Sequence, residues 1–159
     1  MLCPMPPRAS FRDLLRDLLG RTVAVRSGED QVLDPERPSY LAGYRMDDGE
    51  VAALVVVDQR LSVALAAALG MEPAAESLEQ VQASGALEGD LLEFLHEVVN
   101  IAAKLFNSPG TPHVVLRELT PVPGDAPKDL VDLATSPGRR EDWLVSVEDY
   151  GEGLITLMG

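Results

Sequence analysis

The chain has 159 residues, the size of one ordinary domain, and 46% of them are apolar, which argues against a disordered protein. Acidic residues outnumber basic ones by 26 to 13, and the formal charge of −13 argues against binding to nucleic acid or to anionic lipid. With one cysteine and two histidines, we expect no intrachain disulfide and no metal site. We find no signal peptide and no apolar segment long enough to span a membrane, so we expect a cytoplasmic protein.

The N-terminal part of the chain is predicted to contain one helix and three strands. Residues 1–9 include three prolines and are expected to form a flexible tail, followed by a single domain over residues 10–159. Ser10 is a suitable N-cap, and apolar residues at helical spacing predict a helix that stops at Gly20. Strands separated by turn signals are expected over residues 22–26, 39–46 and 51–57, the last one apolar enough to be central.

The rest of the chain is predicted to contain a block of helices and then more strands. Asp58 is placed to cap a helix over residues 59–69, which is apolar nearly all round, should be deeply buried, and is expected to end at Gly70. A short surface helix over 73–82 and a long helix over 87–106 follow. Later elements are strands over residues 111–119, 143–147 and 154–158, and one helical turn over residues 129–134.

This order of elements predicts an α/β fold of the α+β type. We expect a mostly antiparallel sheet with long helices packed on one face. A helix followed by three strands occurs twice, once after Ser10 and again after Leu87, which indicates a weak internal pseudo-duplication.

The predicted long helix carries one polar stripe. Glu93, Glu97, Asn100 and Lys104 recur at steps of four, three and four, and at about 100° per residue they fall opposite the apolar face. Asparagine is unfavourable in the middle of a helix, where Asn100 is expected to lie. The stripe is therefore either an ordinary solvated face or a surface that meets a partner.

The segment Glu97-Val98-Val99-Asn100 resembles the Glu-x-x-Asn signature of the CheC/CheX/FliY family of response-regulator phosphatases. Two other segments agree with this resemblance. The strand ending at Asp58 and the helix ending in Leu69-Gly70 resemble the elements that precede the signature in CheX-like proteins. Residues 153–157 resemble the family's C-terminal ending of glycine and apolar residues. The resemblance covers the chain from about Ser10 to the end and implies a CheX-like domain.

The resemblance also implies a reaction. The substrate would be a CheY-like receiver domain phosphorylated on aspartate, in chemotaxis or another two-component pathway. Asn100 would position the attacking water, and Glu97 would dock on the active-site lysine of the receiver. No cofactor of its own is implied, because the receiver brings Mg²⁺. Four more residues would border the docking surface: Glu93, Phe94, Ile101 and Lys104.

Departures from the family pattern leave a second hypothesis open. Glu93 stands where the family often has serine or aspartate, His96 where it has a small residue, and Lys104 where it commonly has glycine. The alternative is a non-catalytic binding or scaffold module for a receiver or another signalling partner. The first predicted helix contains no second Glu-x-x-Asn, so we expect one site per chain. CheX-like members form homodimers, and exposed sheet edges would permit a homodimer here.

Overall fold

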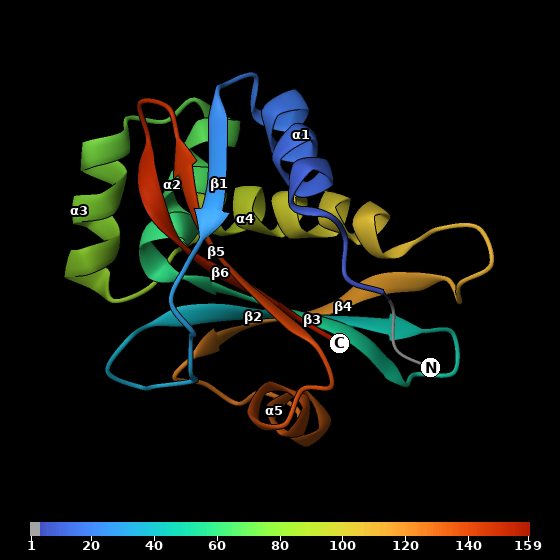
Figure 1. The fold of residues 1–159 in the computed structure, drawn as a ribbon. Helices are drawn as coiled ribbons and strands as arrows, with labels where there is room; N and C mark the ends of the chain where they lie inside the picture. Colours follow the sequence, from blue (N-terminus) through green and yellow to red (C-terminus); the bar gives the residue numbers. More distant parts are fainter. Residues whose placement is uncertain (1–3) are drawn as a thin grey trace.

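The computed structural model describes residues 4–159, in which the strands form one antiparallel sheet (Figure 1). The strand order across the sheet is β1-β5-β6-β3-β2-β4, and every neighbouring pair is antiparallel. This confirms the predicted α+β class with an antiparallel sheet. The bounds are β1 Val23–Ser27, β2 Ser39–Met46, β3 Val51–Asp58, β4 Val114–Val122, β5 Arg140–Val147 and β6 Gly151–Met158.

The strand order has the symmetry of a duplication. If the first three strands are exchanged for the last three (β1 for β4, β2 for β5 and β3 for β6), the order reads the same from the opposite edge. The paired strands β3 and β6 lie at the centre, and β1 and β4 lie at the edges. A helix precedes each set of strands, so the topology agrees with the expected pseudo-duplication.

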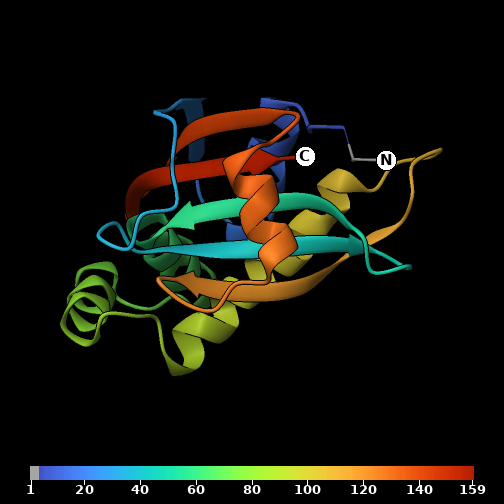
Figure 2. The same ribbon diagram turned by 90° about the horizontal axis from the view of Figure 1, so that it is seen from below.

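The long helices pack on one face of the sheet, as expected, and the short helix α5 covers the opposite face. Side chains of α1, α2 and α4 share one large core with the sheet, and α3 packs on α2. Figure 2 shows α5 crossing the opposite face, with α4 behind the sheet. The bounds are α1 Arg8–Leu19, α2 Gln59–Gly70, α3 Ala74–Ser84, α4 Gly89–Ala102 and α5 Lys128–Thr135, with a 3-10 turn η1 over Ala103–Phe106.

The apolar sequence of β3 explains why both faces need a cover. Successive side chains of a strand point to opposite faces, so Val55 and Val57 enter the large core while Leu54 and Val56 face α5. Leu130 of α5 is fully buried against this second cluster. The strand β3 is apolar from Val51 to Val57, and such a run is typical of a strand covered on both sides.

Ion pairs hold α5 in place. The guanidinium of Arg45 on β2 donates to both carboxylate oxygens of Asp129, at 2.5 and 2.9 Å, and to Glu118 Oε1 at 2.6 Å. The bonds from Arg45 hold the pKa of Asp129 below its ordinary value. The eight residues of α5 thus depend on a partner far away in the sequence, whereas only one helical turn was expected there.

Some element boundaries differ from the prediction. Ser10 is not the N-cap of the first helix: α1 begins at Arg8, and Pro7 precedes it with a φ of −63° that suits a helix start. Residues 1–3 of the expected tail lie outside the described residues. The strand β4 continues through residues 120–122, expected as a loop, because they pair with β2. It begins only at Val114, whose N–H and C=O are both bonded by the Asn107 side chain.

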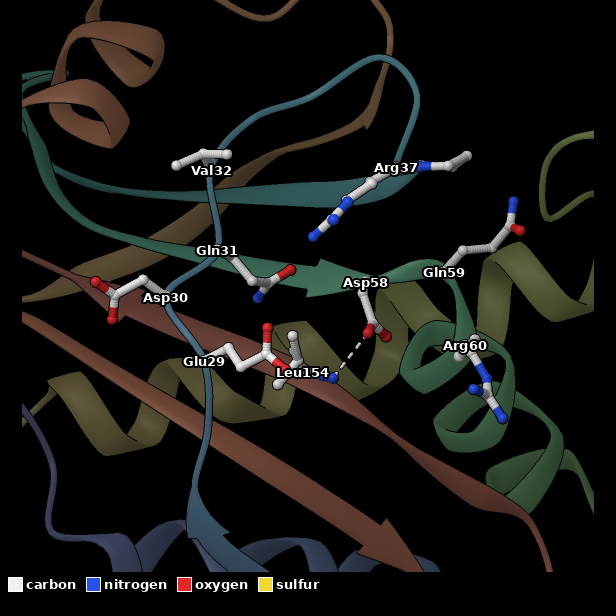
Figure 3. Close-up of a pocket in the computed structure, with 10 residues that line it drawn as sticks. Glu29, Asp30, Gln31, Val32, Arg37, Asp58, Gln59, Arg60 and Leu154 are labelled. Atoms are coloured by element: carbon white, nitrogen blue, oxygen red, sulfur yellow. Dashed lines mark hydrogen bonds between the residues drawn. The ribbon is translucent and has the colours of Figure 1, made fainter.

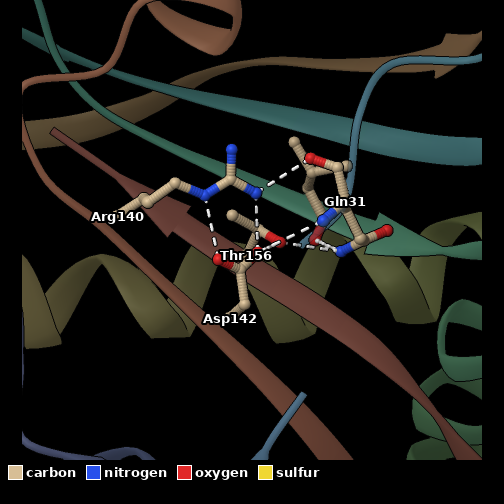
Figure 4. A network of polar contacts seen from close by, with 5 residues as sticks. Gln31, Arg140, Asp142 and Thr156 are labelled. Atoms are coloured by element: carbon tan, nitrogen blue, oxygen red, sulfur yellow. Dashed lines mark hydrogen bonds and ion pairs between the residues drawn. The ribbon is translucent and has the colours of Figure 1, made fainter. Parts of the chain in front are cut away.

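A polar network fixes the long connection between β1 and β2 (Figure 4). Gln31 of this connection bonds to Thr156 on β6 and, through its N–H, to Asp142 on β5. Arg140 donates twice to Asp142, at 2.7 and 2.9 Å, and also to the Gln31 carbonyl. The connection therefore lies fixed across the strands even though it has no regular secondary structure of its own.

Candidate functional site

The helix α4 has one buried face and one open face. Its buried residues point to the sheet and to α2; they are Leu91, Leu95, Val98, Val99 and Ala102. The close packing on α2 depends on Gly70, because a Cβ there would lie 2.2 Å from the ring of Phe94. Gly70, where the helix was expected to end, is thus the last residue of α2, and its lack of a side chain leaves space for Phe94 of α4.

The predicted stripe lies on the open face. Glu93, Glu97 and Asn100 are exposed on α4, and Lys104 is exposed on η1. Within residues 4–159 their side chains form no hydrogen bond and no ion pair with another residue. Glu97 and Asn100 are one helical turn apart, so both point to the same solvent region. The structure brings the stripe together as expected and leaves both polar groups free to meet a partner.

Asn100 lies closer to the helix end than expected. The α-helical geometry stops at Ala102, and the Ala103 N–H already bonds to the Asn100 carbonyl in the manner of a 3-10 turn. The expectation of an asparagine held mid-helix is therefore wrong. Asn100 lies in the last turn of α4, so it lowers the stability of the helix little. The reason for interest in Asn100 is its exposed position beside Glu97.

A tyrosine from the sheet supports this last turn. The Tyr44 hydroxyl on β2 donates to the Val99 carbonyl at 2.5 Å, and the Tyr44 side chain is fully buried. Burial raises the pKa of Tyr44 above its ordinary value, so the phenol remains a donor at all physiological pH values. This bond holds the backbone next to Asn100 against the sheet.

Apolar residues border the stripe on the α2 side. Phe94 and Ile101 are half-buried, and Phe94 packs on α2 at Gly70. Met71, which follows Gly70, was not predicted as a site residue. Its side chain is 84% exposed and its backbone is left-handed, with a φ of +53°. No sequence signal identified Met71, because its exposure follows from how α2 ends against α4.

The site offers positioning groups rather than a nucleophile. An amide has a donor and an acceptor and can orient one water, and a carboxylate can pair with a cation. Residues 4–159 contain no group of three or more His, Cys, Asp or Glu side chains arranged to hold a metal ion. In the same part of the chain, every helix is too short or too polar to cross a membrane.

Comparisons with known proteins identify the fold. No protein-family model matches the sequence, and no curated protein matches it. Among solved structures, FliM from H. pylori in complex with SpeE has a TM-score of 0.63 at 8% identity, covering 95% of this chain and 80% of that chain. The FliM middle domain from H. pylori has a TM-score of 0.54 at 10% identity, covering 95% and 83%. The chain has the fold of the FliM middle domain.

A member of the family that the Glu-x-x-Asn resemblance names is also among the similar solved structures. CheX from Borrelia burgdorferi, solved in a complex with CheY, BeF3 and Mg²⁺, is also similar, with a TM-score of 0.48 at 16% identity over 94% of this chain and 92% of that chain. The fold rests on the likeness to FliM, and any activity has to be inferred from the site.

The first helix of this fold offers no second site of this kind. Asp13 on α1 is paired within its own helix, with Arg12 at 3.1 Å and Arg16 at 3.4 Å. Glu97 on α4 has no such partner among the described residues. One site per chain stays a prediction from the sequence.

A separate hollow of about 290 Å³ lies where α2 begins, away from the stripe (Figure 3). Asp58 lines it, but both of its carboxylate oxygens serve the fold. One accepts from the Leu61 N–H at 2.7 Å, as the predicted cap of α2, and the other accepts from the Leu154 N–H at 2.8 Å. Burial raises the pKa of Asp58. This carboxylate therefore has a structural role, and the open face of α4 is the candidate site.

Proposed function

We propose that the chain hydrolyses the aspartyl phosphate of a CheY-like receiver domain, in chemotaxis or another two-component pathway. The receiver would dock on the open face of α4. Asn100 would orient the attacking water, and Glu97 would pair with the active-site lysine of the receiver. The proposal places this reaction in the cytoplasm, where the sequence led us to expect the chain.

One observation carries the proposal. Glu97 and Asn100 are exposed one turn apart on α4, and neither side chain has a partner within residues 4–159. An ordinary solvated helix face often has ion pairs along it, as α1 does with Asp13 and Arg16. The pair on α4 instead presents one carboxylate and one amide to an incoming surface, in the order of the family signature.

The proposed reaction requires few groups from this chain. The water oxygen forms a bond to phosphorus as the bond from phosphorus to the aspartate oxygen breaks, which yields a carboxylate and inorganic phosphate. Such a transfer depends mostly on positioning and on charge stabilisation. The Asn100 amide would hold the water in line by accepting from it and donating to a neighbouring oxygen. The Mg²⁺ and the lysine of the receiver would offset the charge on phosphate.

A non-catalytic binding module is the second candidate. Both FliM structures described above have TM-scores above 0.5, and one of them is in a complex with SpeE. FliM from H. pylori has also been solved with FliG, with a TM-score of 0.52 at 9% identity. Proteins with the CheC/CheX/FliM-like fold include phosphatases of phosphorylated CheY and non-catalytic FliM. The charged Lys104, where the family commonly has glycine, favours this candidate because a long side chain narrows access to Asn100.

A phosphate-release assay tests the proposal. Receiver domains from the same organism would be phosphorylated with a small phosphodonor and mixed with wild type, Asn100→Ala or Glu97→Ala. Asp17→Ala, at an exposed position of α1, is the matched control. We expect wild type and the control to speed phosphate release and both site variants to lose the effect. If wild type binds receivers without speeding release from any of them, the non-catalytic module replaces the phosphatase.

A homodimer remains a proposal as well. The strands β1 and β4 form the edges of the sheet within the described part of the chain, and an open edge can pair with a second copy. Sedimentation equilibrium would measure the mass in solution. A monomer at all concentrations would contradict the dimer without affecting the proposed activity.

A further inference from the structure

We propose that Met71 and the acidic hollow beside it form one docking surface with the open face of α4, and that this surface selects receiver domains with a basic patch. The inference rests on the proposed function and goes beyond it, because it assigns partner selection to the end of α2 and the start of α4. Three observations support it: an unusual exposed side chain, its place next to the glycine that meets Phe94 on α4, and a uniform charge.

Met71 is exposed in a way that folding does not require. A methionine that is 84% exposed contributes little to the core, and a left-handed backbone at φ +53° is unfavourable for a residue with a side chain. Glycine would cap α2 with less strain. A flexible thioether held in solvent is well suited to pack on a partner of varied shape.

The position of Met71 makes it continuous with the candidate site. Gly70 contacts the ring of Phe94, so the end of α2 lies on one particular flank of α4. Phe94, Glu97 and Ile101 are spaced by three and four residues and therefore follow one another along that same flank. Phe94 and Ile101 thus form an apolar border beside the polar pair, and Met71 directly follows the glycine that meets Phe94.

The charge of this region has one sign. Between Arg60 and Lys104 the chain has no lysine or arginine and seven acidic residues, namely Glu72, Glu76, Glu79, Glu88, Asp90, Glu93 and Glu97. A hollow of about 450 Å³ between α3 and the start of α4 is lined by Glu72, Glu88 and Asp90. Within residues 4–159 none of these three carboxylates has an ion pair. A basic side chain of the partner would complement the hollow while the apolar border packs beside it.

Binding and turnover measured together test this inference. The probes are receiver domains from the same organism, activated with beryllium fluoride and Mg²⁺ for binding and with a phosphodonor for turnover. Met71→Gly removes the side chain and suits the left-handed backbone, so the fold is retained. Met71→Leu keeps an apolar side chain, and Glu72→Lys reverses one charge. Val32→Ala and Glu36→Lys, at exposed positions of the β1–β2 connection, are the matched controls.

A docking role predicts a split between KM and kcat. We expect Met71→Gly to weaken binding and raise KM by about tenfold with kcat unchanged, and Met71→Leu to behave as wild type. Glu72→Lys should slow association at low salt. That difference should shrink toward 1 M salt, where the Debye length falls to about 3 Å. Both controls should match wild type.

Two results would overturn the inference, and they differ from each other. If Met71→Gly and Glu72→Lys bind and turn over as wild type does while Asn100→Ala loses turnover, the docking surface is wrong and the proposed function stands. If wild type neither binds nor dephosphorylates any receiver, the proposed function falls and the docking surface falls with it.

Discussion

The hydroxyl of Tyr44 on β2 donates a 2.5 Å hydrogen bond to the backbone carbonyl of Val99, the residue before Asn100. The carbonyl can accept this bond because the Ala103 N–H turns to Asn100 instead. The sheet thus supplies the partner that the helix gives up where α4 changes into the 3-10 turn η1. The last turn of α4 is therefore anchored to β2 by a contact between residues 55 positions apart.

Tyr44→Phe tests this contact. The substitution removes the hydroxyl and leaves the Val99 carbonyl buried without its donor, which should lower the free energy of unfolding by about 1–2 kcal/mol. Urea denaturation measures the change, and hydrogen exchange of the η1 amides should become faster. Tyr150→Phe, at a half-buried tyrosine whose hydroxyl has no bond within residues 4–159, is the control. A Tyr44→Phe protein as stable as wild type would show that the bond contributes nothing.

Gly70→Ala separates helix propensity from packing. Alanine favours a helix over glycine by about 1 kcal/mol, which alone predicts stabilisation. The new Cβ would lie 2.2 Å from the ring of Phe94, and such overpacking costs about 1–3 kcal/mol. We expect net destabilisation in urea denaturation, and we expect the cost to disappear when Phe94→Ala is added. Stabilisation by Gly70→Ala alone would mean that α2 and α4 do not meet as described.

The surroundings of Asp142 lead us to expect that the free energy of unfolding depends on pH. Burial raises the pKa of this carboxyl, but hydrogen bonds from Arg140, Thr156 and the Gln31 N–H outweigh burial and hold the pKa below its ordinary value. A depressed folded-state pKa means that the stabilisation is present above the unfolded pKa of about 3.9 and is lost as the pH falls through the folded value.

Asp142→Asn should therefore cost about 1.5–3 kcal/mol at pH 7 and progressively less below pH ~4. Urea denaturation of wild type and variant at pH 7, 5 and 3 measures the difference. Asp17→Asn, at a highly exposed carboxylate, should stay within about 0.5 kcal/mol of wild type. A cost for Asp142→Asn that does not change with pH would rule out the charged carboxylate as its cause.

Local sequence signals predicted much of the fold. Asp58 caps α2 as expected, and the largely apolar β3 lies at the centre of the sheet. These features depend on neighbouring residues, so the sequence displays them. The helix α5 was underestimated because its position depends on Arg45, which is far away in the chain. The fixed path of the β1–β2 connection depends likewise on Gln31 meeting Asp142 across the sheet.

The candidate site, like the fold, could be predicted from the sequence only in part. The spacing of Glu93, Glu97 and Asn100 predicted a common face, because helical geometry alone places them together. Met71 escaped prediction, since its position follows from the contact between Gly70 and Phe94 on two different helices. Residues brought together within one helix can be predicted from spacing, whereas residues brought together by packing require the structure.

The most direct test of the proposed chemistry is the rate of receiver dephosphorylation as the concentration of this chain is raised to saturation. At saturation, weaker binding cannot imitate a slower chemical step. We predict that Asn100→Ala lowers the maximal rate by about 100-fold with little change in the half-saturating concentration. Glu97→Ala should mainly raise the half-saturating concentration. A maximal rate for Asn100→Ala equal to that of wild type would contradict the assignment of Asn100 as the residue that positions water.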